Sequence, residues 1–294
     1  MEALKLIALV ALVGCGRIDF DAHGDATDAN PPDASACLGT GTFSNVQAVS
    51  AINDPNTQYG TFISPDGLTL LWDQFNGAHE QLLITQRPTR TDAFPAGAAI
   101  PGTFPNGNAS DPSVTADLLE LYFASDVTGS LCIYRATRAS TAAPFDPSVE
   151  LGALCAGIAT TGPAISADGL TLVYNSALDT EVEGDLYLTE RGNRSADFPV
   201  GKKLNGLPTG IGYPALSADR LRIWFEEEVG PDLEIATEER ISPSDDFSNL
   251  TGLTELDTGT GNGDPSLTLD ESEVFFVSQR TGNYDAFSAS RPCL

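Results

Sequence analysis

Carboxylates are the side chains of this 294-residue chain that could do acid–base or ligand chemistry. Asp and Glu number 41 against 15 Lys and Arg, which gives a formal net charge of −26, and there are only two histidines. His23 and His79 are too few for a multi-histidine zinc site or a Ser-His-Asp triad. No glycine-rich phosphate-binding loop follows a strand and opens a helix. We therefore expect no metal site and no cofactor.

One set of carboxylates recurs every 51 residues, and a set of arginines follows it nearly in register. The carboxylates are Asp66, Asp117, Asp168, Asp219 and Asp270, each two residues after a Ser or Thr. The arginines are Arg87, Arg138, Arg191, Arg240 and Arg291, with a two-residue insertion in the third unit. A catalytic pair breaks the symmetry of a repeat, so we interpret both sets as structural. The sequence does not indicate which Asp pairs with which Arg.

Each recurring Asp lies in a turn between two apolar runs. Ser-x-Asp-Gly is turn chemistry, because Asp and Ser bond nearby backbone groups and Gly tolerates positive φ. Three adjacent apolar residues follow, as in Leu70-Leu71-Trp72, which indicates a strand buried on both faces. A third strand ends at the recurring Arg. A fourth is expected after Phe94, Phe145, Phe198 and Phe247.

Four short antiparallel strands per repeat of about 50 residues are typical of a β-propeller blade. Residues 40–294 hold five such repeats, and the last one stops after its third strand. Phe43 lies one repeat before Phe94, so the segment from Phe43 to about Ala51 should supply the missing strand. The sequence therefore predicts an all-β, five-bladed β-propeller of four-stranded blades, closed by an N-terminal strand in the last blade.

Four of the five cysteines are expected to form two disulfides. Cys132 begins the third strand of the second blade and Cys155 follows its fourth strand, so the two ends should face one another. Cys37 precedes the closing strand and Cys293 follows the strand beside it, so this bridge would replace the loop that joins those strands in the other blades. Four buried free thiols are the alternative.

The first residues resemble a bacterial lipoprotein export signal. Lys5 precedes an apolar run that ends in Leu12-Val13-Gly14-Cys15, which resembles the lipobox and is too short to span a bilayer. We predict a signal peptide over residues 1–14, an acidic disordered tether over 15–39 with Cys15 lipidated, and the propeller over 40–294. A buried N-terminal helix with an incidental Cys is the alternative.

The repeat resembles a known family. Pro163, Ser166, Asp168, Gly169 and Leu170, together with Gly184-Asp185-Leu186-Tyr187, resemble the Pro-Asp type of WD40-like repeat found in the TolB propeller and other bacterial envelope proteins. The first unit has Thr61 in place of Pro, and three units replace the Gly, with Leu118, Arg220 and Glu271. The resemblance implies an exported propeller that works by binding, and it carries no catalytic motif.

The acidic composition narrows the possible partners. Nucleic acids and anionic headgroups require basic surfaces, so we expect no nucleic-acid partner and attachment to the membrane only through Cys15. We predict a monomeric lipoprotein of the outer membrane, on its periplasmic face or at the cell surface. It is expected to bind an envelope protein or glycan without catalysis. The alternative is a glycan-active enzyme that uses funnel carboxylates about 5 to 9.5 Å apart.

The binding residues are expected where the repeat varies. We expect a Pro, or Thr61 in the first unit, to open each first strand. The residue just before it differs between units and is Gly60, Asp111, Gly162, Tyr213 or Asp264. These positions adjoin the polar crossings between blades, at 53–59, 105–111, 156–161, 207–213 and 258–264. Loops on a rigid scaffold commonly carry binding. We predict binding by Tyr213, Asp111 and Asp264, with Tyr59 and Asn262 beside them; the alternative is that these positions vary because nothing constrains them.

Overall fold

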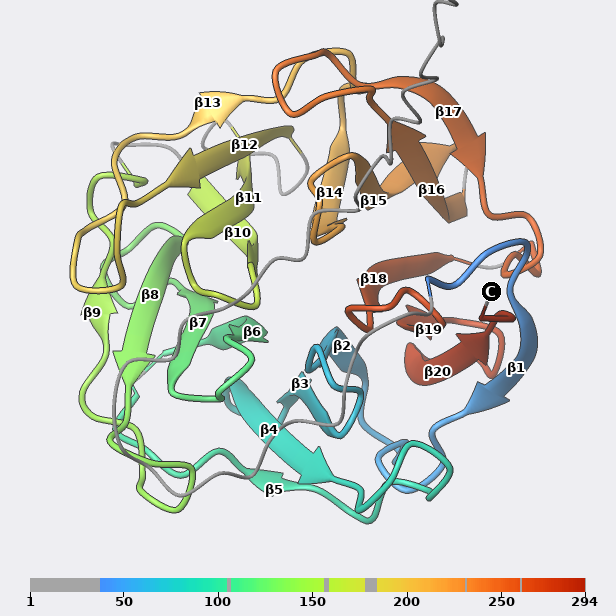
Figure 1. The fold of residues 1–294 in the computed structure, drawn as a ribbon. Coiled ribbons are helices and arrows are strands. Elements are labelled where there is room, and N and C mark those ends of the chain that lie inside the picture. The colour runs from blue at the N-terminus through green and yellow to red at the C-terminus, as the bar shows by residue number, and fades with distance from the viewer. Residues whose placement is uncertain are drawn as a thin grey trace, which may run out of the picture. The chain divides into compact units, whose positions relative to one another are not determined.

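The computed structural model describes residues 38–104, 107–155, 159–177, 184–230, 232–259 and 261–293. Within these ranges five four-stranded antiparallel sheets surround a central axis, as Figure 1 shows. The predicted five-bladed β-propeller is therefore confirmed. No helix among the described residues has the length and apolar character needed to cross a bilayer. The predicted signal peptide, Cys15 and most of the tether lie outside the described residues.

Three blades end in a very short outer strand. The first blade consists of β2 (Gln58–Ile63), β3 (Thr69–Phe75), β4 (Glu80–Gln86) and β5 (Ala98–Ala99). The second consists of β6 (Ala109–Val114), β7 (Glu120–Ser125), β8 (Cys132–Thr137) and β9 (Val149–Glu150). The third consists of β10 (Ala159–Ile165), β11 (Thr171–Ala177), β12 (Asp185–Glu190) and β13 (Lys202–Lys203).

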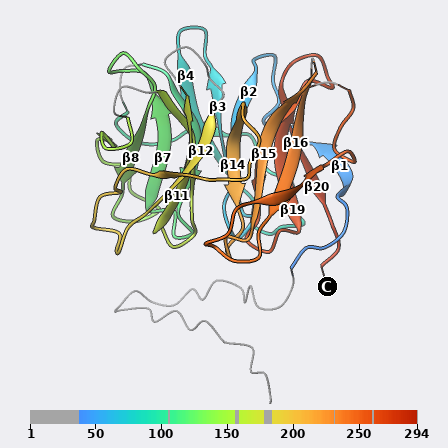
Figure 2. The ribbon, with the colours of Figure 1, turned by 90° about the horizontal axis from the view of Figure 1, so that it is seen from above.

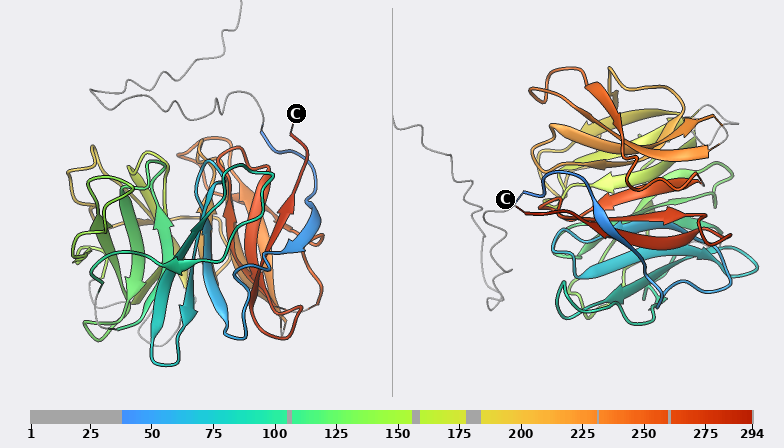
Figure 3. Two further views of the ribbon diagram at one scale, coloured as in Figure 1. Left: turned by 90° about the horizontal axis from the view of Figure 1, so that it is seen from below. Right: turned by 90° about the vertical axis from the view of Figure 1, so that its right-hand side faces the viewer.

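The last two blades have longer outer strands, and the fifth is completed from the N-terminal side. The fourth consists of β14 (Ile211–Leu216), β15 (Arg222–Val229), β16 (Asp232–Glu239) and β17 (Ser248–Gly252). The fifth consists of β18 (Asn262–Leu267), β19 (Glu273–Ser278), β20 (Asp285–Ser290) and β1 (Ser44–Ala48). β1 pairs antiparallel with β20 at the outer edge of this blade, as Figure 3 shows. The predicted closure is thus confirmed.

The core lies between neighbouring sheets. Leu70, Leu71 and Trp72 of β3 are all buried, as the apolar run predicts. Leu71 packs in one cluster with Leu121 and Phe123 of the next blade, so each sheet supplies side chains to two interfaces. This arrangement explains why the second strands are apolar on both faces.

The Ser-x-Asp turns repeat with nearly constant geometry. In the first, Ser64 donates a hydrogen bond to Asp66 at 2.5 Å, and Asp66 accepts one from the Leu68 backbone N–H at 2.9 Å. The residue after each Asp has a positive φ between 55° and 76°, whether or not it is glycine. These residues are Gly67, Leu118, Gly169, Arg220 and Glu271. Three turns therefore keep the conformation without the residue that favours it.

The recurring arginines bind the same turns. Arg138 Nε donates to the Leu118 carbonyl at 2.7 Å, and its guanidinium lies 4.5 Å from the centroid of Phe145. The same pair of contacts occurs in all five blades, and in the last one Arg291 stacks at 4.6 Å on Phe43. The structural interpretation of the Asp and Arg sets is therefore confirmed.

The ring has two faces, which Figure 2 shows from the side. The turn face carries the five Ser-x-Asp turns. The crossing face is opposite, and it carries the hairpins between second and third strands and the crossings between blades. The described chain begins at the turn face, where the Gly39 N–H donates to the Asp270 carbonyl at 2.6 Å.

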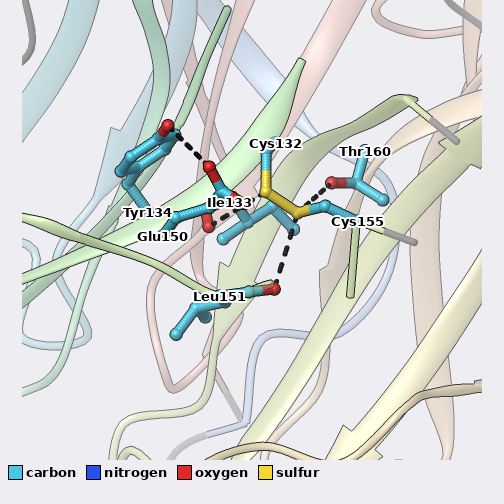
Figure 4. The surroundings of a disulfide bond; sticks show 7 residues. All are labelled: Cys132, Ile133, Tyr134, Glu150, Leu151, Cys155 and Thr160. Carbon is cyan, nitrogen blue, oxygen red and sulfur yellow. Dashed lines mark hydrogen bonds between the residues drawn. A yellow bond between two sulfur atoms is a disulfide. The ribbon is translucent and has the colours of Figure 1, made fainter. Parts of the chain in front are cut away.

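One of the two predicted disulfides lies among the described residues. Cys132 and Cys155 are bridged, with their Cα atoms 5.5 Å apart, as Figure 4 shows. Cys37 lies outside the described residues, so its bridge to Cys293 stays a prediction. Gly39, two residues after Cys37, forms a backbone bridge with Cys293.

Candidate functional site

The variable positions form a ring around the central axis. Neighbouring first strands contact one another in sequence around the propeller, and each contributes one residue of the column. We call the set Gly60, Asp111, Gly162, Tyr213 and Asp264 the axial ring. The structure thus brings Asp111, Tyr213 and Asp264 close together around the central axis.

The expectation that these residues lie in loops is wrong. The first strands begin two or three residues before the ring positions, so Asp111 lies inside β6 and Tyr213 inside β14. A β-bulge interrupts the pairing at each position, for example between Ser110 and Ser113. The Pro that was expected to open the strand, such as Pro112, lies within this bulge, where the ladder does not need its missing N–H.

The bulge requires an unusual backbone conformation. All five ring residues have φ between 50° and 56°. This is routine for Gly60 and Gly162, but it is uncommon for Asp111 and Asp264 and a clear outlier for Tyr213. Non-glycine residues persist in such conformations when the surroundings fix them, and such positions cluster at functional sites.

Carboxylates accept backbone hydrogen bonds across the blade junctions at this level. The Gly60 N–H donates to Asp264 Oδ2 at 2.8 Å, and the Gly162 N–H donates to Asp111 Oδ2 at 3.1 Å. The Asp111 N–H donates to Asp73 Oδ1 at 2.9 Å. Each of these bonds joins one blade to the next, and all are buried.

A second column completes the pattern. The equivalent positions of the second strands are Asp73, Ala124, Asn175, Glu226 and Val277. Where this position is apolar, at Ala124 and Val277, the ring residue of the same blade is an Asp. Where it is Asp73 or Glu226, the ring residue carries no carboxylate. Four blades therefore place one carboxylate each at this level.

The sequence reasoning missed Asp73 and Glu226. Both occupy the position directly after the three apolar residues of the second strand. The residue type at this position varies between blades, as it does in the axial ring. Added Cβ atoms at Gly60 and Gly263 would collide with Asp73 Oδ1 and Glu226 Oε2, which shows how closely both carboxylates approach the first strands.

These carboxylates favour their neutral forms more than exposed ones do. Burial, with the negative charge of Asp264 adding to it, raises the pKa of Asp111 to about 7. Burial raises the pKa of Asp264 to about 6. Burial and then the nearby Asp111 hold the pKa of Asp73 well above its usual value. The three residues are 8%, 6% and 0% exposed, respectively.

The tyrosines lie close to the carboxylates. Burial, followed by the charges of Asp111 and Asp264, holds the pKa of Tyr213 well above its usual value. An added Cβ at Gly162 would lie 3.4 Å from Tyr213 Cδ1, so glycine leaves space beside the ring. Tyr59 packs against Tyr284 with 5.3 Å between ring centroids.

The Asn262 side chain makes its hydrogen bonds with other residues. It is 1% exposed, donates to Asp257 Oδ1 at 3.3 Å, and accepts from Arg280 at 3.1 Å. Its side chain is thus engaged within the propeller.

The site offers hydrogen-bond acceptors and one phenol in a rigid, desolvated frame. Among the described residues, no group of three or more His, Cys, Asp or Glu side chains is arranged to hold a metal ion. Asp73, Asp111 and Asp264 lie near enough to one another to interact electrostatically. However, Asp73, Asp111 and Asp264 are buried and already accept backbone hydrogen bonds between blades.

The comparisons with known proteins show the fold. No protein-family model matches the sequence, and a search of curated proteins gives no match. A thermostable family-43 glycoside hydrolase superposes with a TM-score of 0.57 at 12% identity, covering 84% of this chain and 93% of the other. The catalytic domain of a Coprinopsis cinerea family-62 α-L-arabinofuranosidase gives 0.54 at 10% identity, covering 87% and 97%.

TolB from Acinetobacter baumannii is also similar, with a TM-score of 0.50 at 16% identity. The match covers 83% of this chain but only 57% of that TolB. The chain is therefore similar in fold both to TolB and to glycoside hydrolases. Sequence identities this low show a shared fold and nothing about function.

Proposed function

We propose that this protein is a lipid-anchored cell-envelope β-propeller that binds a protein or glycan partner at the axial ring without catalysis. The observation that carries the proposal is the engagement of the ring carboxylates. Asp111 and Asp264 accept backbone hydrogen bonds across blade junctions, so they hold the first strands of neighbouring blades in a rigid polar frame. Tyr213, among them, offers an aromatic contact of the kind common at recognition surfaces.

The lipobox-like Leu12-Val13-Gly14-Cys15 supports the proposed anchor, and we propose the outer membrane, on its periplasmic face or at the cell surface, as the location. The described chain begins at the turn face. A tether attached there leaves the crossing face accessible to a partner.

Capture from native envelope extract tests the binding site. A variant with Asp111→Asn, Asp264→Asn and Tyr213→Phe removes the carboxylate charges and the phenol hydroxyl. It keeps a side-chain oxygen that can accept each backbone hydrogen bond, and it keeps the aromatic ring. We expect crosslinked partners identified by mass spectrometry to be lost from this variant and kept by a control with Asp197→Asn, Asp246→Asn and Ile241→Ala. These control residues are exposed loop residues of the turn face. Equal capture by both folded variants would refute the axial ring as the site.

The second candidate is a glycan-active enzyme. The raised pKa values of Asp111 and Asp264, about 7 and about 6, favour it because general acids need such values near neutral pH. Hydrolysis of aryl glycosides, including 4-nitrophenyl α-L-arabinofuranoside, tests it. Turnover by the wild type that is lost in Asp111→Asn and Asp264→Asn would establish the enzyme and exclude binding without catalysis.

A further inference from the structure

The two faces of the propeller differ in how many of their acidic side chains form ion pairs. At the turn face, carboxylates are paired with arginines across or within blades. These pairs include Glu273 with Arg87 and Arg90, Glu120 with Arg191 and Arg194, and Glu271 with Arg222 and Arg291. Although burial raises the pKa of Asp117, hydrogen bonds from Arg194 and Thr115 lower it below its ordinary value.

At the crossing face, several acids near the hairpins between second and third strands have no such partner, although Asp185 pairs with Lys203 at 2.6 Å. Glu80, Asp126, Glu227 and Glu234 have no ion pair within the described part of the chain. Glu227 and Glu234 are directly opposed in the β15–β16 ladder, an arrangement that destabilises a sheet. Burial and then Glu234 raise the pKa of Glu227, and burial and then Asp126 raise that of Glu80.

The arginine on this face does not neutralise these acids. Arg280 donates to the Leu256 carbonyl at 2.7 Å and to Asn262 Oδ1 at 3.1 Å, and its guanidinium lies 4.5 Å from the Phe287 centroid. Its charge is therefore directed into the fifth blade.

Two buried acceptors below this face also lack donors. Asp73 Oδ2 and Gln58 Oε1 make no hydrogen bond within the described residues, and both residues are 0% exposed. Asp73 belongs to the carboxylates around the axial ring, since its pKa responds to Asp111 and Asp264. A buried acceptor without a donor is costly, so these atoms point to a donor that the described residues do not supply.

Exposed apolar side chains stand beside the acids on the same face. Phe75, Val127 and Val229 occupy the ends of hairpins between second and third strands and are 47%, 42% and 43% exposed. Repelling charges and exposed apolar groups are local costs that a partner of opposite charge would relieve.

We propose that the crossing face docks a basic polypeptide segment, with a lysine or arginine side chain directed at the axial ring. The inference rests on the proposed binding function and adds the chemistry of the partner. Cationic side chains donate to carboxylates and neutralise them, and apolar residues of the same segment contact the hairpin ends. A neutral glycan could not neutralise the face, a nucleic acid would be repelled, and no metal-binding group is present among the described residues.

Binding of a fluorescein-labelled octalysine peptide to the full chain, followed by anisotropy, tests the inference. The crossing-face variant carries Glu80→Gln, Asp126→Asn, Glu227→Gln and Glu234→Gln. The control carries Asp146→Asn, Asp197→Asn, Asp245→Asn and Asp246→Asn, which lie exposed in loops of the turn face. Both variants change the net charge equally. We expect the crossing-face variant to lose about tenfold in affinity and the control less than about twofold at low salt.

Equal losses in the two variants would overturn the inference, because octalysine would then be responding to net charge alone. Absence of octalysine binding by the wild type would overturn it as well. Displacement of the peptide by micromolar Ca²⁺ would assign the face to a metal ion instead. None of these results decides the proposed function, which fails only if capture from envelope extract does not depend on the axial ring.

Discussion

The ionisation of Asp111 and Asp264 should make stability depend on pH around neutrality. Their folded-state pKa values, about 7 and about 6, exceed the ordinary value of 3.8. A raised carboxyl pKa leaves stability intact below the unfolded-state pKa and lowers it as pH rises through the folded-state value. We therefore expect the free energy of unfolding to fall between about pH 4 and pH 7.5.

Asp111→Asn should remove much of this dependence. The amide oxygen can still accept from the Gly162 N–H, while the charge penalty disappears. We expect a gain of about 2 kcal/mol at pH 8 and little change at pH 4.5, measured by urea unfolding. Exposed Asp246→Asn is the control and should follow the wild type at both pH values. A variant that is no more stable than the wild type at pH 8 would contradict the origin of the shift.

Backbone strain at Arg220 provides a second prediction. Arg220 has a φ of 63° at the turn position that glycine occupies in two other blades. Arg220→Gly should stabilise the protein by about 0.5 to 1 kcal/mol relative to Arg220→Ala, because only glycine adopts this conformation without cost. Both variants lose the ion pair with Glu190, so their difference isolates the backbone. Thermal unfolding of the two variants measures it, and the idea fails if alanine is equally stable.

At the level of strands and turns, each recurring arginine connects a turn to the start of an outer strand. Arg138 shows this best, because it hydrogen-bonds the Leu118 carbonyl and stacks on Phe145 without an ion pair in the described residues. Arg138→Lys removes the Nε donor and the planar stacking group. We expect a loss of about 1 to 2 kcal/mol by chemical denaturation.

A double-mutant cycle with Phe145→Leu separates the stacking contribution. The coupling energy between the two positions should be about 0.5 to 1 kcal/mol. Additive effects would show that the arginine acts only through its hydrogen bond to the turn.

The repeat explains how far these elements could be predicted from sequence. Phe43 was placed in the last blade by its offset from Phe94, and it occupies the same position against Arg291 that Phe94 occupies against Arg87. The beginnings of the first strands were missed because Ser110 and Asp111 are typical of loops in isolation. The bulge allows a residue with positive φ and a proline to lie inside a strand. The residues of one repeat do not predict such a bulge.

Only part of the site could be predicted from the variation between repeats. Asp111, Tyr213 and Asp264 came from one variable column. Asp73 and Glu226 lie in a second column that becomes meaningful only when both strands are placed side by side across a blade junction. Asn262, chosen for its position near the ring, is engaged by Arg280 instead.

At the scale of the whole molecule, ring closure should depend on a covalent link between Cys37 and Cys293. Non-reducing peptide mapping should recover this linkage together with Cys132–Cys155. Replacing Cys37 and Cys293 by Ser should lower the free energy of unfolding by up to about 4 kcal/mol, because the bridge would close nearly the whole propeller. Recovery of Cys37 joined to Cys132 or Cys155 would contradict the strand assignment.

The pairing of β1 with β20 also has a mechanical meaning. β1 borders no strand except β20, and the chain before it is held at the turn face by the bonds from Gly39 to Asp270 and from Thr40 to Pro292. Once the predicted Cys37–Cys293 bridge is reduced, tension applied at Leu38 therefore loads these two bonds first and then the contact between Phe43 and Arg291. In a stretching experiment between Leu38 and a point on the first blade, the first rupture should be the detachment of β1, which opens the ring at the fifth blade while the other blades remain folded.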